Sequence, residues 1–213
     1  MKVAVISANI GGFDTEKPIP KQTVEFDRYY YTDKNLPVPM HTQDARMKAK
    51  LMKIVPHLYL PNYDVYVWLD GNIQVKSERF IETILQALDG KDISISNHPF
   101  RSDIYHEAAF ICDEIKKGNK YLSTRYSIDS VKREMEDISQ DLEGLYWCGC
   151  FARVNSRLVN IAFEEWFMQN ILYTNFDQLS FVKVVNGVGL KLGIFDFGSF
   201  YGNDYYELKH HLK

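Results

Sequence analysis

Apolar residues along the chain fall into short strand-like runs, separated by longer segments with helical spacing. Continuous apolar runs cover residues 2–7 and 65–69, and the alternation in "VEFDRYYYTD" predicts a strand that ends at Asp33. The segments "DISIS", "LYWCGCFARV" and "LKLGIFDF" predict three further strands. These six segments are expected to contribute to a β-sheet.

Helices are predicted between the strands. Thr42 is placed to cap a helix that runs to about Val55, where Pro56 ends it, and Ser77 to cap another through Leu88. Further helices are predicted over 102–117, 124–137, 156–170 and 178–185. This alternation indicates an α/β fold with a mixed, mostly parallel central sheet flanked by helices, whose ligand crevice lies at the carboxyl ends of strands.

Length and charge narrow the setting. A chain of 213 residues with 46% hydrophobic residues fits one globular domain, and no internal repeat or linker divides it. The net charge of -3 and the lack of a lysine-rich block give no reason to expect a nucleic acid partner. No run of 18 apolar residues occurs, so no membrane insertion is expected, and the three cysteines favour a reducing, cytoplasmic location.

The strand at 65–69 ends on an acid, a glycine and an amide: Asp70, Gly71 and Asn72. Residues two apart in an extended segment project to the same side, so Asp70 and Asn72 can direct two oxygens at one cation. Mg²⁺ and Mn²⁺ prefer such ligands and complete their coordination with substrate phosphates. The same residues are also typical of a hairpin turn with "IQV" as the return strand, so both interpretations stay open.

Three cations lie on one face of the helix that precedes this strand. Arg46, Lys50 and Lys53 stand at positions i, i+4 and i+7. Such a stripe could bind a nucleotide diphosphate, or it could be a solvated helix edge whose side-chain stems cover the core. Together with the oxygen pair, these cations predict two halves of a diphosphate site.

Several stretches resemble GT-A glycosyltransferases. They are "YDVYVWLDGNIQV", with "KIVPHLYLP" before it and "SNHPFRSDIYHEA" after it, and later "GLYWCGCFARVNS" and "NFDQLSF". The pattern is most similar to a hexosyltransferase-like family of plants, bacteria and large viruses, whose members carry a D-x-D or D-G-N element. The resemblance covers most of the chain and extends to the N-terminal glycosyltransferase domains of large multidomain chlorella-virus proteins.

The resemblance implies a single GT-A, Rossmann-like domain over residues 1–213, taken from a longer protein with further C-terminal domains. It implies transfer of a hexose or deoxyhexose from a UDP-sugar to a glycan or glycoprotein acceptor, with retention and with Mn²⁺ or Mg²⁺ on the diphosphate. A viral source would place this activity in the host cytoplasm.

The resemblance also assigns the donor site. Asp70 and Asn72 would bind the metal and the diphosphate. To these the residue pattern itself adds Gly71, which lets a ligand approach the backbone, and the cations Arg46 and Lys50. The ends of the first two strands would hold the nucleoside, at Ser7, Ala8, Asn9, Thr32 and Asp33.

Asn72 stands where many relatives have a second aspartate, so a third metal ligand is expected. Glycogenin-like relatives use a C-terminal histidine, and here the tail offers His210 and His211. The alternative is that these histidines lie at an ordinary polar helix end.

Residues for the sugar and the acceptor come from two other motifs. The resemblance implies catalytic roles for Asp177 and Gln178 and substrate contacts for His98 and Arg101. Asp177 could instead be a helix N-cap, and His98 and Arg101 could belong to an ordinary surface loop. In the buried strand "CGC", Gly149 is expected to leave room for a substrate.

Two other classes of function stay open. A sugar-phosphate nucleotidyltransferase usually carries a glycine-rich, Arg/Lys-containing loop after its first strand, and "SANIGGFDTEK" matches this only in part. A non-catalytic carbohydrate-binding module would bind sugars without nucleotide or metal.

Overall fold

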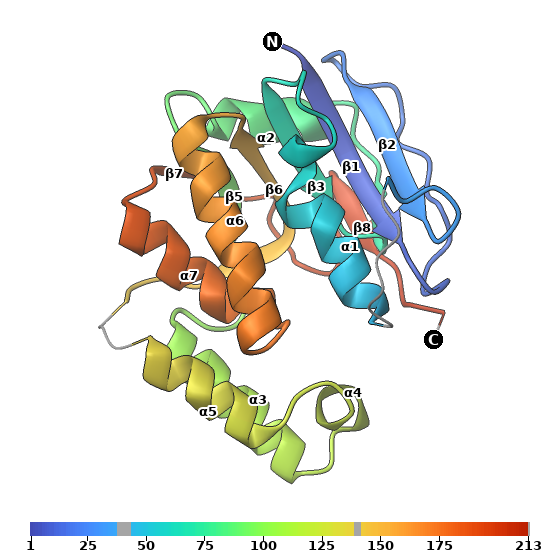
Figure 1. Ribbon diagram of the computed structural model, residues 1–213. Coiled ribbons are helices and arrows are strands. Elements are labelled where there is room, and N and C mark those ends of the chain that lie inside the picture. The colour runs from blue at the N-terminus through green and yellow to red at the C-terminus, as the bar shows by residue number, and fades with distance from the viewer. Residues whose placement is uncertain (38–43, 139–141, 213) are drawn as a thin grey trace.

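The central feature of the computed structural model is a six-stranded mixed sheet (Figure 1). The structure describes residues 1–37, 44–138 and 142–212. The strands, in spatial order, are β2 (Asp27–Thr32), β1 (Val3–Asn9), β3 (Val65–Leu69), β6 (Tyr146–Val154), β5 (Ile93–Asn97) and β7 (Leu192–Ile194). Only β6 within this sheet runs antiparallel to its neighbours. The predicted mixed, mostly parallel sheet is therefore confirmed.

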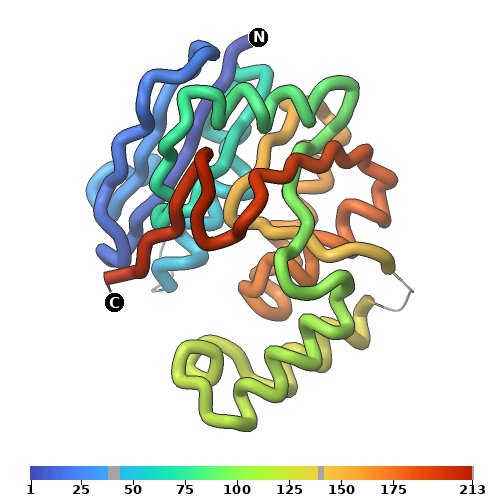
Figure 2. The backbone as a smooth tube through the Cα atoms, turned by 180° about the vertical axis from the view of Figure 1, so that it is seen from behind, coloured from blue at the N-terminus to red at the C-terminus, as the bar shows by residue number. Residues whose placement is uncertain are grey.

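Helices cover both faces of this sheet. α1 (Ala45–Ile54), α6 (Arg157–Leu172) and α7 (Asp177–Val188) lie on one face, and α2 (Phe80–Ala87) lies on the other (Figures 1 and 2). A short 3₁₀ turn, Pro56–Leu58, follows α1 where the predicted proline stop stands. The predicted α/β layering is confirmed.

The two faces are filled by alternate residues of the same strands. Ala4 and Ile6 pack toward α1 and α6, whereas Val3 and Val5 pack toward α2. β3 behaves in the same way and is buried along its whole length, which explains why it reads as a continuous apolar run. The position of Asp70 at the end of β3 is thus fixed by a buried strand.

Three helices form a third group. α3 (Ile104–Lys116), α4 (Lys120–Ser123) and α5 (Ile128–Asp137) lie at the bottom of Figure 1 and share an apolar cluster with α7. α3 begins after Asp103, whose side chain accepts from the backbone N–H of His106 at the helix start. This helical group lies below the sheet in Figure 1, on the side where α1 begins.

The hairpin interpretation of the D-G-N turn is wrong. The segment "IQV" does form a strand, β4 (Ile73–Val75), but β4 pairs with β8 (Tyr206–Leu208) in a separate two-stranded sheet. β3 instead pairs with β1 and β6. Asp70 therefore ends a central strand, and the chain leaves the main sheet immediately afterwards.

Two predicted helix caps and one strand need correction. Thr42 lies outside the described residues, and the cap of α1 is Asp44, which accepts a hydrogen bond from the Arg46 backbone N–H at 2.8 Å. Ser77 does not cap α2, because α2 begins only at Phe80 and its N-cap is Arg79. The Ser77 hydroxyl instead accepts a hydrogen bond from the Arg79 backbone N–H, before the helix starts. The last predicted strand is shorter than expected, because only Leu192–Ile194 pairs with β5.

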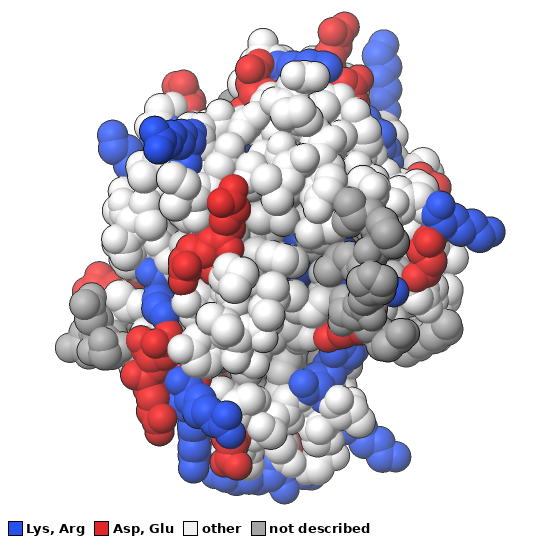
Figure 3. All heavy atoms as spheres, in the orientation of Figure 1, with Lys and Arg blue, Asp and Glu red and all other residues white. Residues whose placement is uncertain are grey.

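The surface shows no extended field of one charge on the face that Figure 3 presents. Among the residues coloured there, acidic and basic side chains are interspersed around the rim.

Within the described parts of the chain, no helix is both long and apolar enough to cross a membrane. Cys112, Cys148 and Cys150 are free thiols.

Candidate active site

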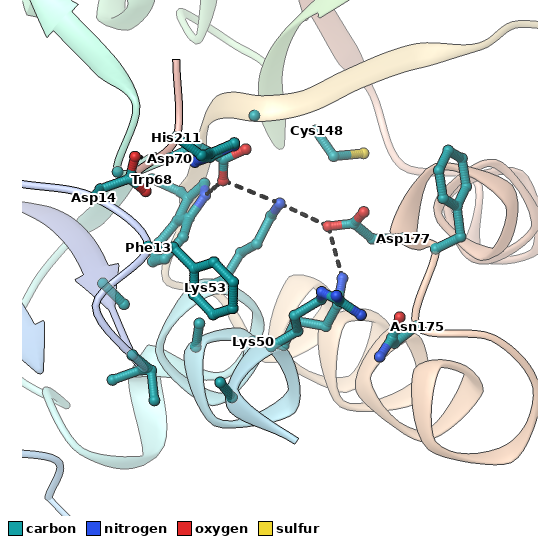
Figure 4. Close-up of a pocket in the computed structure, with 18 of the residues that line it drawn as sticks. Phe13, Asp14, Lys50, Lys53, Trp68, Asp70, Cys148, Asn175, Asp177 and His211 are labelled. Atoms are coloured by element: carbon teal, nitrogen blue, oxygen red, sulfur yellow. Dashed lines mark hydrogen bonds and ion pairs between the residues drawn. The ribbon is translucent and has the colours of Figure 1, made fainter. Parts of the chain in front are cut away.

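A cavity of about 310 Å³ opens at the carboxyl ends of β1 and β3 (Figure 4). The antiparallel strand β6 begins at the same edge, since Cys150 pairs with Leu69, and it adds Trp147, Cys148 and Gly149 to the wall. Helix α1 and the start of α7 close the other side. The crevice thus lies at the carboxyl ends of parallel strands, as predicted for this class of fold.

Asp70 stands at one end of the cavity. Its Oδ1 accepts a hydrogen bond from the indole Nε1 of Trp68 at 2.6 Å and lies 3.5 Å from Lys53 Nζ. The side chain is 39% exposed, so the carboxylate remains open to a ligand. Trp68, which lies two residues before Asp70 in β3, therefore orients this carboxylate through its indole hydrogen bond.

Asp14 and His211 lie beside Asp70. His211 Nδ1 is 3.0 Å from Asp14 Oδ1, and Figure 4 shows both side chains next to Asp70. The hydrogen bond to Asp14 raises the pKa of His211; burial opposes this shift, and the charges of Asp14 and Asp70 add to it. The bond on Nδ1 leaves Nε2 available for another ligand. Two carboxylates and one imidazole thus share this end of the cavity, named here the acidic end.

The glycine of the D-G-N turn is required by this arrangement. A Cβ atom on Gly71 would lie 2.8 Å from Asp14 Oδ2 and 3.2 Å from the Ala8 carbonyl oxygen. Lys17 Nζ donates to the Gly71 carbonyl at 2.9 Å, and Asn9 accepts from the Asp14 backbone N–H at 3.0 Å. The turn therefore holds the loop after β1 close to the end of β3.

The C-terminal segment reaches back to the same loop. The Leu212 backbone N–H donates to the Phe13 carbonyl at 2.8 Å, and the Lys209 N–H donates to the Asn72 carbonyl at 2.9 Å. Figure 1 accordingly shows the C-terminus beside the end of β1. These backbone bonds bring His211 into the cavity.

The opposite end holds a buried ion cluster, named here the lysine end. Asp177 Oδ2 lies 2.9 Å from Lys50 Nζ and 2.6 Å from Lys53 Nζ. Both lysine side chains are buried, and Asp177 is 17% exposed. In Figure 4, Lys53 bridges the two ends, because it faces both Asp177 and Asp70.

The pKa shifts follow from this pairing. Burial opposes the charged form of Asp177, but Lys50 and Lys53 outweigh it and hold the pKa of the carboxyl well below its usual range. Burial likewise opposes charge on Lys53, yet Asp177 and Asp70 together raise its pKa. For Lys50, burial prevails over the same partner, and its pKa is lowered. Asp177 is therefore firmly ionised.

Two contacts hold the segment that contains Asp177 in place. Its backbone carbonyl accepts from the indole of Trp166 at 3.0 Å, and the neighbouring Asn175 donates to Asp44 at 2.7 Å. The N-cap alternative for Asp177 is wrong: it is the first residue of α7, whose N-cap is Phe176 with no side-chain capping bond. Its carboxylate is directed to the lysines instead.

The structure brings many of the predicted residues to one cavity. Asp70 and His211 meet at the acidic end, and Lys50 and Asp177 meet at the lysine end. The other predicted residues that line the cavity are Ala8, Asn9, Arg46, Gly71, Gly149 and Gln178.

Other predicted residues lie outside the cavity lining. Neither Asn72 nor His210 lines it, and His210 is exposed. At the ends of the first two strands, Ser7 is buried and Asp33 accepts from the Gly11 backbone. Thr32 also lies outside, hydrogen-bonded to Asn35.

His98 and Arg101 form a local loop contact. His98 Nδ1 accepts from the Arg101 backbone N–H at 3.2 Å, and the Arg101 guanidinium pairs with the buried Glu107. Neither side chain lines the cavity. The nearby Asp103 does not pair with Arg101, because Asp103 caps α3.

The expected role of Gly149 also needs revision. A Cβ atom there would lie 2.5 Å from the indole nitrogen of Trp147, so the glycine makes room for this indole. Its carbonyl accepts from the Asp70 backbone N–H at 2.8 Å. Gly149 therefore positions Trp147 and Asp70 in the wall of the cavity.

Several cavity residues were not predicted. Asp14 lies in the loop after β1, and no local sequence pattern reveals that it pairs with a histidine near the other end of the chain. The helical spacing of the cations identified Lys53, but it could not show that Lys53 lies between Asp177 and Asp70. The further unpredicted lining residues include Phe13, Tyr121, Arg125, Tyr126, Trp147 and Asn175.

The acidic end has the chemistry of a divalent-cation site. Carboxylate oxygens and an imidazole nitrogen suit Mn²⁺, and Mg²⁺ commonly binds through one or two carboxylates with waters and substrate phosphates. Among the described residues, no group of three or more His, Cys, Asp or Glu side chains is arranged to hold a metal ion. Asp70 and His211 could therefore hold a cation only if other ligands, such as waters or substrate phosphates, completed its coordination.

A model of one protein family matches most of the chain. The profile described as "TOD1/MUCI70, glycosyltransferase-like domain" matches residues 34–200. No curated protein matches the sequence. A glycosyltransferase involved in glycosylating the major capsid of PBCV-1 superposes with a TM-score of 0.49 at 8% identity, covering 91% of this chain and 81% of that one. Mouse xyloside xylosyltransferase 1 superposes with a TM-score of 0.49 at 12% identity, covering 92% and 86%.

The profile match decides the family. It spans β3, the D-G-N turn, both lysines and Asp177, and it covers well over half of the chain. The weak structural likenesses assign no role to any residue. The chain belongs to the TOD1/MUCI70 family of glycosyltransferase-like domains.

Proposed function

We propose that this domain is a metal-dependent glycosyltransferase that uses a nucleotide-sugar donor. The observation that carries the proposal is the acidic end of the cavity, where Asp70, His211 and Asp14 converge at the carboxyl ends of β1 and β3. A nucleotide diphosphate is strongly anionic, so carboxylates can approach it only through a cation. A diphosphate bound together with a cation would account for the clustering of acidic residues beside Lys53.

Asp70 and His211 would hold Mn²⁺ or Mg²⁺. Once bound, the cation would supply Lewis-acid neutralisation of the charge that develops on the leaving diphosphate. Asp14 would orient His211 through its bond to Nδ1, as carboxylates commonly do for metal-bound histidines. Lys53 would add a fixed positive charge at the same end.

The donor is proposed to be a UDP-sugar carrying a hexose or deoxyhexose. The nucleoside would lie along the ends of β1 and β2, near Asn9 and Phe13, which line the cavity. Arg46 lines the same cavity from the start of α1, where it can face the diphosphate. The acceptor is proposed to be a glycan or a glycoprotein.

Retention of configuration is the proposed stereochemical outcome. An inverting enzyme needs a carboxylate base for the acceptor hydroxyl, with a pKa near the working pH. Asp177 is a poor base because two lysines lower its pKa. Asp14 and Asp70, the other carboxylates in the described lining, belong to the acidic end. Front-face attack assisted by the departing phosphate requires none of them as a base.

The direct test is UDP release from a panel of UDP-hexoses and UDP-deoxyhexoses, with Mn²⁺, with Mg²⁺ or with EDTA. A thermal-shift series in the same buffers measures binding separately, because ligand-linked stabilisation does not need turnover. We expect one donor to stabilise the protein only when the metal is present, and to release UDP under the same conditions.

Other outcomes would favour the alternative functions. Stabilisation by NTP with release of pyrophosphate from a sugar phosphate would indicate a nucleotidyltransferase. Failure of every nucleotide sugar to bind, together with binding of free glycans, would indicate a carbohydrate-binding module. Either result would overturn the proposed transferase activity.

A further inference from the structure

A row of aromatic rings leads from the cavity wall to the protein surface. Trp147 lines the cavity and contacts Phe200, with ring centroids 5.1 Å apart. Phe200 contacts Phe100 at 5.4 Å and Tyr201 at 5.2 Å, and Phe100 and Tyr201 are 6.0 Å apart. These four rings, named here the aromatic platform, are therefore continuous with the proposed active site.

The outer two rings are unusually open. Phe100 is 55% exposed and Tyr201 is 67% exposed. They come from distant parts of the sequence, the loop after β5 and the C-terminal segment, which lie close together in Figure 2. Exposed aromatic side chains that gather beside a cavity commonly mark a binding surface.

The platform is held in place by backbone bonds. The Tyr206 hydroxyl donates to the Phe200 carbonyl at 2.9 Å, and the Leu208 N–H donates to the Tyr201 carbonyl at 2.9 Å. Tyr206 also stacks on Trp147 at 5.8 Å. Because the rings are already positioned, little conformational entropy is lost when a ligand covers them.

A polar group stands next to the exposed rings. His98 packs edge-to-face with Phe100, at 6.0 Å between centroids. Its Nδ1 accepts backbone hydrogen bonds from Phe100 and Arg101, so a neutral ring carries its proton on Nε2 as a donor. Burial and the neighbouring Arg101 lower the pKa of His98 to about 4, which keeps the ring neutral near pH 7.

We infer that the aromatic platform is the acceptor subsite and binds a saccharide, with pyranose rings lying on Phe100 and Tyr201 and the reacting hydroxyl directed past Trp147 into the cavity. This inference rests on the proposed function. Sugars present apolar C–H faces and polar edges, and exposed aromatic rings beside hydrogen-bonding groups match both. Continuity with the cavity is the reason to choose a saccharide over a protein partner, because an acceptor must reach the donor.

Two sets of variants test the inference. Phe100→Ala and Tyr201→Ala each remove an exposed ring, whereas Tyr201→Phe keeps the ring and removes only the hydroxyl. Leu158→Ala is the matched control, because Leu158 is also an exposed apolar residue but lies on α6, on the other face of the sheet. The probe is a glycan array of plant, bacterial and animal oligosaccharides, followed by titration with its tightest-binding glycan.

We expect Phe100→Ala and Tyr201→Ala to weaken glycan binding about tenfold or more each. Tyr201→Phe and Leu158→Ala should stay within about twofold of the parent protein. All four variants should keep the parent's thermal stabilisation by UDP with Mn²⁺. In acceptor-dependent transfer, the two alanine variants should raise the acceptor KM, whereas UDP release to water stays unchanged.

Three results would overturn the inference. The first is that the parent protein binds no glycan at millimolar concentration, and the second is that the alanine variants bind glycans as tightly as the parent protein does. The third result is a dimer of the parent protein that is lost in Tyr201→Ala, which would show that the platform mediates self-association. Failure of the proposed function looks different, since the parent protein would then show no stabilisation by any nucleotide sugar with metal, whatever its glycan binding.

Discussion

The two ends of the cavity use charged residues in opposite ways. At the lysine end, Asp177 lies within 3 Å of both Lys50 and Lys53, so each of the three charged groups already has an oppositely charged partner inside the protein. At the acidic end, Asp70 and Asp14 face a partly exposed histidine, and negative charge remains in excess. The first arrangement needs no ligand, whereas the second would be completed by the proposed cation.

This contrast separates residues that support the site from residues that would act on a substrate. Buried ion pairs are costly to break, because the partner left behind is a desolvated charge. A partly exposed carboxylate such as Asp70, whose side chain is 39% exposed, has little effect on folding but a large effect on the binding of a charged ligand. Substitutions at the two ends should therefore differ in whether activity or stability is lost.

The largest effect is expected at Asp70. Asp70→Asn keeps the shape and can still accept from Trp68, but it removes the charge that would hold the cation. We expect kcat for UDP release to fall by about 10²- to 10³-fold, whereas the melting temperature changes by only a few degrees. Activity within threefold of the parent protein would refute the metal role of this residue.

The next largest effect is expected at Asp177, and on stability. Asp177→Asn leaves two buried ammonium groups without their shared carboxylate, which should lower the free energy of unfolding by about 3 kcal/mol. Urea unfolding measures this change, with Asp70→Asn as the matched control. Adding Lys50→Met to Asp177→Asn should recover part of the loss, because one unpaired charge is removed. Equal stability of the two aspartate variants would contradict the contrast between the ends.

A smaller effect is expected at His211. His211→Ala should weaken Mn²⁺-dependent donor binding about tenfold, and Asp14→Asn should have a similar effect because it frees the imidazole. His210→Ala is the control, since His210 is exposed and does not line the cavity. Titration of UDP in the presence of Mn²⁺ checks this order. A larger effect of His210→Ala would reverse the assignment.

The smallest effect concerns pH. Asp14 raises the pKa of His211, so the folded protein binds this proton more tightly than the unfolded chain does. The resulting stabilisation is fully present below the unfolded pKa of about 6.5 and is lost as the pH rises through the folded value. With the side chain 43% exposed, the change should be under about 1 kcal/mol. Urea midpoints between pH 5 and 9 should vary less in His211→Ala than in the parent protein.

The sequence predicted the central strands β1 and β3 well because these strands are buried. Val65–Leu69 is apolar throughout, since both faces of β3 are covered, and the position of Asp70 follows from the end of that run. Local patterns were less reliable for pairing. "IQV" has strand character, but nothing within it indicates that its partner is β8 rather than β3.

The sequence correctly predicted that the cations of α1 share one helix face, but it did not predict their ion-pair partners. Helical spacing placed Lys50 and Lys53 on one face, and the structure confirms this face. Their pairing with Asp177 depends on packing α7 against α6 and β6, which brings the start of α7 to the lysines of α1 and which no local spacing encodes. Of the three predicted cations, Arg46 has no ion pair within the described residues.

The choice between the two C-terminal histidines also required tertiary structure. His210 and His211 are adjacent, and composition cannot distinguish them. The bond from Leu212 to Phe13 fixes how the segment approaches the cavity, and Asp14 then meets His211. Asp14 itself was missed for the same reason, because its meaning depends on a residue near the opposite end of the chain.

The acidic end is built from residues at both ends of the sequence, and this affects the order of events during synthesis. β1, β3 and the loop with Asp14 leave the ribosome early and can begin to fold while later segments are still being translated. His211 emerges last among the residues of this site. An unfinished chain can therefore contain a formed sheet yet lack His211, so under the proposed function it would bind the nucleotide sugar with its metal less tightly than a chain translated through residue 211.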